Sequence, residues 1–328
     1  MAIPPKLLIQ TAQLVWKTMW HTMMAQLAPS DNAGGFQRVE SQFRDSLGSA
    51  KFPAAPNRYR LYIGLTCPWA HRTAITRVLK GLEGVIDMST AIADVSVGGW
   101  RLENDPTGCG NMKELYQLAQ PGYAGRCSVP VLWDCETNSI VNNESSEIIV
   151  MLNDQFNEYA QYPDRDLYPA SVREEGDRLN DLIYNTVNNG VYRCGFARSQ
   201  AAYDQAVNEL FGTLDLLDER LGDRRYLLGE PITLADVRLF TTLIRFDLVY
   251  HGLFKCDRRR IRDYENLSGY LRDIYQLPGI AATAPLATIQ QEYYSSLFPL
   301  NPGGIIPTGV DLQTFEQPHN RGDRPPIS

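Results

Sequence analysis

The segment Tyr62-Ile63-Gly64-Leu65-Thr66-Cys67-Pro68-Trp69-Ala70-His71-Arg72 contains the features that decide the fold. Side chains alternate in character over residues 58–65, which is typical of a short β-strand. Pro68 suits the first turn of an α-helix, and a helical pattern continues to Gly81. Cys67 is therefore predicted at a strand–helix junction, where free backbone N–H groups and the helix dipole stabilise an anion.

The segments that follow complete an α/β pattern. Residues 85–97 are predicted to form a second strand, followed by a long polar loop that contains Trp100. Residues 129–133 and 140–141 resemble a hairpin, and residues 144–156 have a helical apolar stripe. The order strand, helix, strand, two strands, helix is the thioredoxin-type arrangement, with the cysteine at the end of the first strand.

Beyond Pro163 and Pro169 the strand signals vanish. Residues 170–189, 200–221, 233–250, 264–276 and 278–293 have apolar periodicity near 3.6, which predicts an all-helical second domain. The segment Thr233-Leu234-Ala235-Asp236 has the form of a capping box at the start of its central helix. We predict an N-terminal extension with an amphipathic helix (1–57), a thioredoxin-like domain (58–160), an all-α domain (168–298) and an irregular tail (299–328).

The N-terminal segment, residues 6–27, places most of its large apolar side chains near one helical face. Lysines, glutamines and threonines interrupt it, so it is too polar to span a bilayer, and it lacks the form of a secretory signal. A helix packed on the body of the protein is the favoured interpretation. Peripheral contact with a membrane is the alternative.

Charge and cysteine content exclude several functions. The formal net charge of −7 argues against a nucleic-acid-binding surface, which needs clustered positive charge. The six cysteines include no C-x-x-C pair and no Cys/His cluster with zinc-like spacing, so no metal site is expected. They do not form a disulfide scaffold either, which indicates a reducing compartment, the cytoplasm.

Cys67 is the candidate nucleophile. A helix N-terminus lowers the pKa of cysteine thiols, and the thiolate is the reactive form. In related redox sites a second cysteine stands three residues later, but here that residue is Ala70. An internal disulfide is excluded within this motif, so the resolving thiol must come from elsewhere, and glutathione is the obvious supplier. The alternative is a buried, inert cysteine.

Two further motifs fit a peptide-like thiol. In Ser128-Val129-Pro130, a proline that enters a strand of a thioredoxin-type sheet is usually cis, which leaves Val129 free to pair with the cysteinyl backbone of glutathione. At the start of the helix near residue 144, Glu144 can accept from an α-amino group while Ser145 and the helix N-terminus receive an α-carboxylate. A trans proline and an ordinary helix cap are the respective alternatives.

These motifs together resemble the soluble glutathione transferase superfamily, and in particular its Xi class, the glutathionyl-hydroquinone reductases. The resemblance runs from about Gly34 to Gly304. It rests on the following segments: Gly34–Arg38, Cys67–Arg72, Val129–Asp134, Asn143–Ser145, Asn188–Tyr192, Arg245–Asp247, His251–Cys256 and Asp273–Gln276.

The resemblance implies roles for individual residues. Cys67 matches the nucleophile of the family. The glutathione contacts match Trp100, Arg126, Val129, Glu144 and Ser145. The tyrosines that line the pocket for the aromatic substrate match Tyr192 and the Tyr293-Tyr294 pair, of which one member is expected to point inward.

The resemblance also implies the reaction. Cys67 attacks the sulfur of a glutathionyl-hydroquinone, and a second glutathione, acting as co-substrate, releases the enzyme from the resulting mixed disulfide. An Omega-like thioltransferase or dehydroascorbate reductase, and a non-catalytic interaction module of the same fold, are the alternatives. A homodimer is expected from the family, and Cys127, two residues before Val129, could be an accidental second thiol.

Overall fold

The computed structural model describes residues 4–322, apart from the side chains of residues 26 and 27. Its N-terminal half contains a five-stranded mixed sheet with the order β3-β2-β1-β4-β5. The strands are β1 (Tyr59–Gly64), β2 (Asp87–Asp94), β3 (Gly99–Arg101), β4 (Val131–Asp134) and β5 (Ser139–Asn142). Only β1 and β2 pair in parallel, and all the other pairs are antiparallel. This is the predicted thioredoxin-like arrangement.

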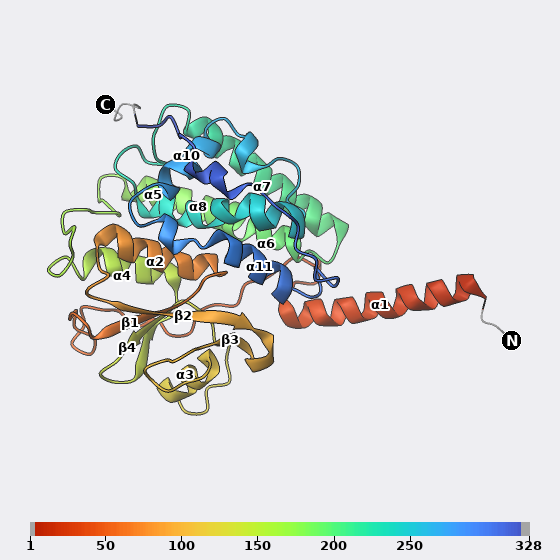
Figure 1. The fold of residues 1–328 in the computed structure, drawn as a ribbon, viewed down its shortest axis with the longest axis horizontal. Helices are drawn as coiled ribbons and strands as arrows, with labels where there is room; N and C mark the ends of the chain where they lie inside the picture. Colours follow the sequence, from red (N-terminus) through yellow and green to blue (C-terminus); the bar gives the residue numbers. More distant parts are fainter. Residues whose placement is uncertain (1–3, 323–328) are drawn as a thin grey trace.

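Three helices cover the sheet. Helices α2 (Pro68–Lys80) and α4 (Ser145–Asp154) lie on the face toward the second half of the chain, and α3 (Met112–Ala119) lies on the opposite face (Figure 1). Helix α3 was not predicted, because it is only eight residues long and lies in a polar segment. Trp100 also differs from the prediction, since it lies in the short strand β3 and not in a loop.

The second half of the chain is helical, as predicted. Its main helices are α5 (Arg173–Ile183), α6 (Gly190–Gly195), α7 (Gln200–Arg220), α8 (Leu234–Arg245), α10 (Leu267–Tyr275) and α11 (Leu286–Ser296). Two stretches of π-helix interrupt this pattern. One, Tyr184–Asn188, joins α5 to α6, and the other, Phe246–Tyr250, joins α8 to the short α9 (His251–Leu253). Helix α8 packs on α2 and so joins the two halves.

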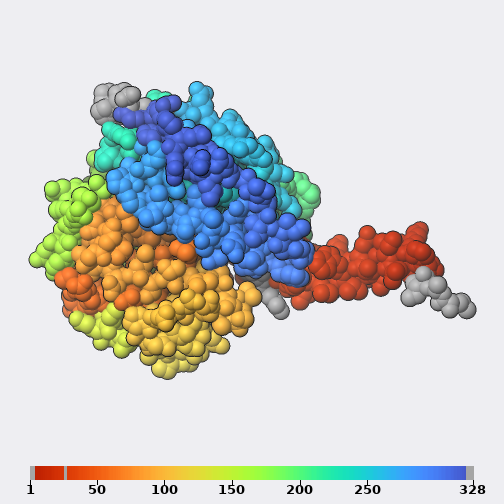
Figure 2. Space-filling model, viewed as in Figure 1, coloured from red at the N-terminus to blue at the C-terminus, as the bar shows by residue number. Residues whose placement is uncertain are grey.

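The N-terminal helix α1 (Pro5–Leu27) corrects one expectation. It projects from the body as an arm, and only its last turns contact the rest of the chain (Figures 1 and 2). Met24 is buried in the helical core, Trp20 packs against that core, and the Trp20 indole donates to the carbonyl oxygen of Pro299 at 3.1 Å. The outer turns are exposed, so packing of the whole helix on the body was wrong. No helix among residues 4–322 is both long and apolar enough to cross a membrane.

The C-terminal tail runs over the surface of the helical half, mostly without regular structure. Its short 3₁₀ turn, Leu312–Glu316, packs beside α10 and buries Phe315. Gln276 at the end of α10 donates to the backbone carbonyls of Phe315 and Gln317. The tail is therefore attached to the body by specific hydrogen bonds.

The predicted capping box begins α8. Asp236 is fully buried, and its carboxylate accepts from the backbone N–H and the hydroxyl of Thr233, each at 2.8 Å. The same carboxylate also accepts from the Leu227 backbone N–H at 2.8 Å and from the Tyr270 hydroxyl at 2.9 Å. One side chain thus holds together a helix start, a preceding loop and α10.

We expect Asp236→Ala to lower the free energy of unfolding by about 3 kcal/mol, because it leaves several buried donors without an acceptor. Glu174→Ala is the control, since the Glu174 side chain is 88% exposed and its ion pair with Arg178 is a surface contact. Urea denaturation of both variants measures the difference. Equal midpoints for the two variants would contradict the structural role of Asp236.

Candidate active site

Cys67 is the N-cap of α2 and is separated from the end of β1 by Leu65 and Thr66. Its backbone conformation is extended, and Pro68 provides the first helical residue. The thiol points across the junction to the Val129 carbonyl oxygen, at 3.6 Å. Ala70, one turn further, is fully buried in the sheet core, so the position of a resolving cysteine is occupied by an inert methyl group.

Arg245, at the end of α8, fixes the loop that leads into Cys67. Its guanidinium is fully buried and donates to the carbonyl oxygens of Leu65, at 2.7 Å, and Thr66, at 3.0 Å. It also contacts His71 Nδ1 at 3.0 Å. A cation from the helical half therefore determines the backbone path immediately before the candidate nucleophile.

The tautomer of His71 follows from its two neighbours. Arg245 can only donate, so Nδ1 accepts, and Nε2–H donates to the Thr283 hydroxyl at 2.8 Å. Burial, and then the charge of Arg245, hold the pKa of His71 well below its ordinary value. His71 is therefore a neutral link between α2, α8 and the turn that precedes α11, and it has no proton to offer Cys67.

A pocket beside Cys67 brings together most of the predicted glutathione contacts. Arg126, Val129, Glu144 and Ser145 all line it. Val129 precedes a cis peptide bond to Pro130, as predicted. The pairing of β4 with β1 begins at Val131, so Val129 lies beyond the sheet ladder. The pocket therefore presents a strand edge, a guanidinium and a helix N-terminus.

The pocket has a defined negative group in Glu144, the N-cap of α4. Its carboxylate accepts from the backbone N–H of Ser146 and from the hydroxyls of Ser146 and Ser41, each at 3.0 Å. Burial alone raises the pKa of Glu144, but these hydrogen bonds outweigh burial and lower it. Glu144 is therefore ionised at neutral pH and suits an ammonium group. It also caps α4, so the helix-cap alternative holds together with the binding role.

Two residues that sequence reasoning missed hold the pocket walls in place. The Tyr116 hydroxyl donates to the Ser128 carbonyl oxygen at 2.9 Å, one residue before Val129. The buried Asn143 amide in turn donates to the Tyr116 oxygen at 3.0 Å. Tyr116 comes from the unpredicted helix α3, so no local pattern connected it with the site.

Positive charge gathers around Trp69, which lines the same pocket. The guanidinium of Arg38 lies 4.0 Å from the centre of a Trp69 ring, and that of Arg72 lies 4.3 Å from it. Arg72 is buried, and burial, followed by repulsion from Arg238, lowers its pKa to about 9. Arg38 lines the pocket, and its guanidinium suits one of the carboxylates of an anionic tripeptide such as glutathione.

Trp100 does not line this pocket. Its ring rests against Gly64, at the end of β1, so closely that a Cβ at residue 64 would overlap the indole. Cys67 and Trp100 both pack at the edge of the same sheet core. Glycine at residue 64 is therefore required by the close approach of the indole.

A cluster of three tyrosines lies in the helical half. The Tyr293 hydroxyl from α11 is 2.8 Å from the hydroxyl of Tyr192 on α6 and 3.1 Å from that of Tyr250, at the end of the π turn. Tyr294 is not in this cluster, since its hydroxyl lies beside Gly252. The structure thus brings Tyr192 together with Tyr293 and adds Tyr250, which no sequence signal had indicated.

The cluster is protonated at neutral pH. Burial, and then negative charge at Cys67, raise the pKa of Tyr192 above its ordinary value. Burial also raises the pKa of Tyr250 and Tyr293 well above theirs. Because a phenol with a raised pKa keeps its proton, all three hydroxyls remain hydrogen-bond donors.

The other cysteines differ from Cys67 in their surroundings. Burial raises the pKa of Cys127, whose thiol points to the Gly125 carbonyl, so it stays protonated at neutral pH. All six cysteines are free thiols. Among residues 4–322, no group of three or more His, Cys, Asp or Glu side chains could hold a metal ion.

We expect Gly64→Ala to weaken glutathione binding by about tenfold, because the added methyl group displaces the Trp100 ring from the wall next to Cys67. Gly84→Ala is the matched control, since nothing lies within 4 Å of a Cβ there. Isothermal titration with glutathione measures both. An unchanged dissociation constant in Gly64→Ala would remove Trp100 from the binding site.

Comparison with known proteins agrees with this geometry. Residues 66–155 match the model of the glutathione S-transferase N-terminal domain, and residues 200–273 match that of the C-terminal domain. Glutathionyl-hydroquinone reductase YqjG of Escherichia coli is 45% identical over 94% of this chain and 97% of its own length. Glutathionyl-hydroquinone reductase PcpF of Sphingobium chlorophenolicum is 44% identical over 90% of this chain and 94% of its own.

Solved structures give the same result. The Xi glutathione S-transferase of Phanerochaete chrysosporium superposes with a TM-score of 0.83 at 42% identity, covering 86% of this chain and 95% of its own. The glutathione-bound structure of Escherichia coli YqjG gives a TM-score of 0.81 at 45% identity, covering 87% of this chain and 98% of its own. The chain belongs to the glutathione transferase superfamily and, within it, to the Xi class.

Proposed function

We propose that this protein reduces glutathionyl-hydroquinones to hydroquinones with glutathione as co-substrate, and that Cys67 is the nucleophile. The observation that carries the proposal is the position of Cys67 at a helix N-terminus, with its thiol 3.6 Å from the carbonyl oxygen of Val129, a residue that lines the charged pocket. The names of the two curated relatives support the same activity.

The reaction has two displacement steps. In the first, the Cys67 thiolate attacks the glutathionyl sulfur, a Cys67–glutathione disulfide forms, and the aryl carbon–sulfur bond breaks. The bonding electron pair stays with the ring carbon, which takes up a proton. In the second, the thiolate of a second glutathione attacks the mixed disulfide, so oxidised glutathione leaves and Cys67 is restored. Two glutathione sulfurs are oxidised and the ring is reduced, which balances the electrons.

The charged pocket holds the glutathionyl part. Val129 supplies backbone bonds to the cysteinyl unit, as a strand edge does for an extended peptide. Glu144 binds the α-ammonium group, and Ser145 with the N-terminus of α4 binds the α-carboxylate. Arg126 pairs with the glycyl carboxylate, and Trp100 covers the tripeptide.

The tyrosine cluster holds the ring and supplies the proton. Tyr192 and Tyr293 donate hydrogen bonds to the hydroquinone oxygens, and their protonated state suits a general acid. Tyr250 orients the Tyr293 hydroxyl through their mutual hydrogen bond. Tyr294 lies outside the cluster and is not assigned a role. A homodimeric state and a cytoplasmic location, expected from the family, complete the proposal.

The decisive experiment compares three substrates: a glutathionyl-hydroquinone, dehydroascorbate and a small disulfide. We expect the first to be turned over best, and Cys67→Ala to abolish this turnover. Cys127→Ala and Cys109→Ala are the controls, with little change expected, since neither thiol occupies a helix N-terminus. Mass spectrometry of the intact protein after one turnover without free glutathione should find one glutathionyl group on Cys67.

Other results of this substrate comparison would indicate one of the two alternative functions. Preference for dehydroascorbate or the small disulfide, with Cys67 still required, identifies an Omega-like thioltransferase. Full turnover in Cys67→Ala would refute the mechanism. Glutathione binding without turnover of any of the three substrates identifies a non-catalytic interaction module.

We expect Tyr192→Phe to lower kcat by on the order of 100-fold, the usual contribution of a general acid, while the dissociation constant of glutathione stays within about twofold. Tyr294→Phe is the matched control, because it removes a hydroxyl from the neighbouring residue outside the cluster. Steady-state kinetics and titration with glutathione separate the two effects. Equal kcat values for both variants would exclude Tyr192 as the proton donor.

A further inference from the structure

We propose that helix α1 binds the surface of an anionic phospholipid bilayer, lying in the plane of the membrane. The proposal does not rest on the proposed enzymatic function. It rests on the exposure of α1, on the arrangement of its apolar side chains, on its charge and on its continuity with an exposed apolar loop near α11.

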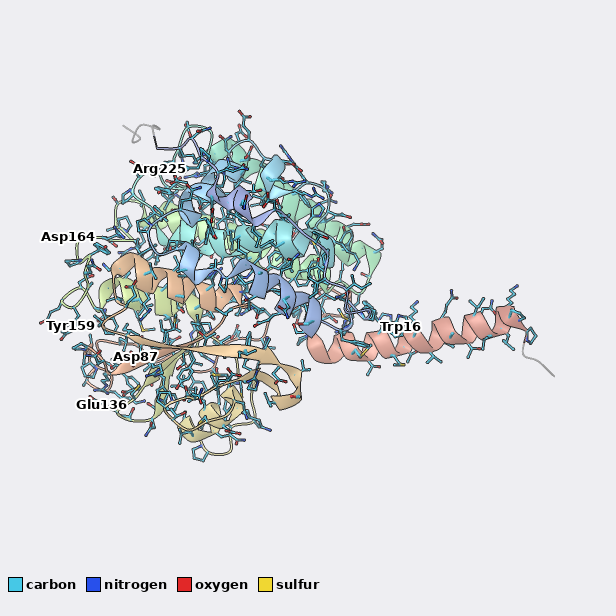
Figure 3. All side chains as sticks on the ribbon, in the orientation of Figure 1. Trp16, Asp87, Glu136, Tyr159, Asp164 and Arg225 are labelled. Atoms are coloured by element: carbon cyan, nitrogen blue, oxygen red, sulfur yellow. The ribbon has the colours of Figure 1, made fainter. Side chains whose placement is uncertain are left out.

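Helix α1 exposes apolar side chains that a globular protein normally buries. Its seven large exposed apolar residues are 45–67% accessible; they are Leu7, Leu8, Ile9, Leu14, Val15, Trp16 and Met19. With 23 residues, α1 is about 35 Å long, and most of this length, Trp16 included, stands clear of the body (Figure 3). A contiguous exposed apolar surface of this kind marks an interaction site.

Most of these side chains fall on one face. At 100° per residue, Leu8, Ala12, Val15, Met19 and Met23 follow one another at intervals of three and four residues. Ile9, Trp16 and Trp20 form a second row beside them. The opposite face carries Gln10, Lys17, Thr18 and His21, interrupted by Leu7 and Leu14. A broad apolar face of this kind, with lysine and polar side chains opposite, suits a helix that lies in a membrane interface.

The charge of α1 is opposite to that of the rest of the chain. Residues 1–30 contain Lys6 and Lys17 and no acidic residue, so this segment carries +2. Because the whole chain carries −7, the remaining residues carry −9. The positive apolar arm is therefore attracted to anionic headgroups while the body is repelled from them, which favours binding through the projecting arm alone.

The apolar surface continues past the base of the arm. Trp20 is bonded to the Pro299 carbonyl, and the adjacent residue Phe298 is 51% exposed. The same loop carries Ile305 and Ile306, both exposed, and is closed by a bond from Asn301 to the Ile305 carbonyl. This loop directly follows α11, the helix of Tyr293.

A second copy of the chain is the less favoured occupant. Apart from α1 and the loop around Phe298, the large exposed apolar residues among residues 4–322 are spread over separate elements, for example Met88 on β2, Leu118 on α3 and Leu216 on α7. They offer no apolar face of matching length, so a second copy would have to cover α1 with its own α1, which carries the same charge of +2. A fluid bilayer needs no such complementary groove.

The test measures cosedimentation of the full-length protein with vesicles. The vesicles contain either equal parts of phosphatidylglycerol and phosphatidylcholine or phosphatidylcholine alone. We expect about 30-fold stronger partitioning onto the anionic vesicles, from the two lysines, and loss of most of this preference in high salt. Absence of binding, or equal binding to both vesicle types, would overturn the proposal.

Two double variants separate apolar insertion from charge. Leu8→Glu with Met19→Glu places two carboxylates on the apolar face, and Gln10→Glu with Thr18→Glu places two on the polar face, at exposed positions with the same net charge. Because both variants cancel the charge of +2 on the arm, we expect about 30-fold weaker partitioning onto anionic vesicles for the second, and at least a further tenfold loss for the first. Equal losses would refute insertion of the apolar face.

Light scattering without vesicles measures the oligomeric mass and so tests whether a second copy of the chain covers α1. A lower oligomeric mass in the apolar-face variant alone would mean that α1 covers a second copy, which would also overturn the proposal. Turnover of a water-soluble substrate is expected to be unchanged in both variants, because these side chains lie far from Cys67, and it reports that the body is folded.

Discussion

The site depends on one buried cation, Arg245, that reaches from the helical half of the chain into the sheet half. Its guanidinium binds the carbonyl oxygens of Leu65 and Thr66, the two residues before Cys67. Backbone carbonyls in a loop between a strand and a helix would otherwise turn to solvent or lose their partners on burial. By satisfying them, Arg245 fixes the end of β1 relative to α8. His71 extends the same contact to Thr283.

This connection explains how the site can be assembled from both halves of the chain. The sheet half supplies Cys67 and the pocket around Glu144, and the helical half supplies Tyr192 and Tyr293. A proton donor is useful only when its position relative to the nucleophile is fixed within fractions of an ångström. Packing of α8 on α2 provides the approximate alignment, and the hydrogen bonds of Arg245 make it specific.

Much of this could be predicted from local patterns. The strand–helix junction at Cys67, the cis proline after Val129 and the cap at Glu144 are properties of short segments with strong conformational preferences. Tyr250, Arg245 and Tyr116 could not be predicted, because their partners lie far away in the sequence and on elements with weak signals, such as α3. The projection of α1 was missed for a related reason. An amphipathic pattern predicts that the apolar face of a helix is covered, but it does not identify the surface that covers it.

The two π turns determine the direction of two tyrosines of the cluster, Tyr192 and Tyr250. A π turn contains one residue more than the α turn that it replaces, so the helix beyond it is rotated by about 100°. Tyr250 ends one such turn, and Tyr192 follows the other by four residues. One extra residue in each helix therefore sets the direction in which Tyr250 and Tyr192 point, while the turns before it keep their packing. Inserting or removing one residue at such a turn would redirect the side chains beyond it without rebuilding the core.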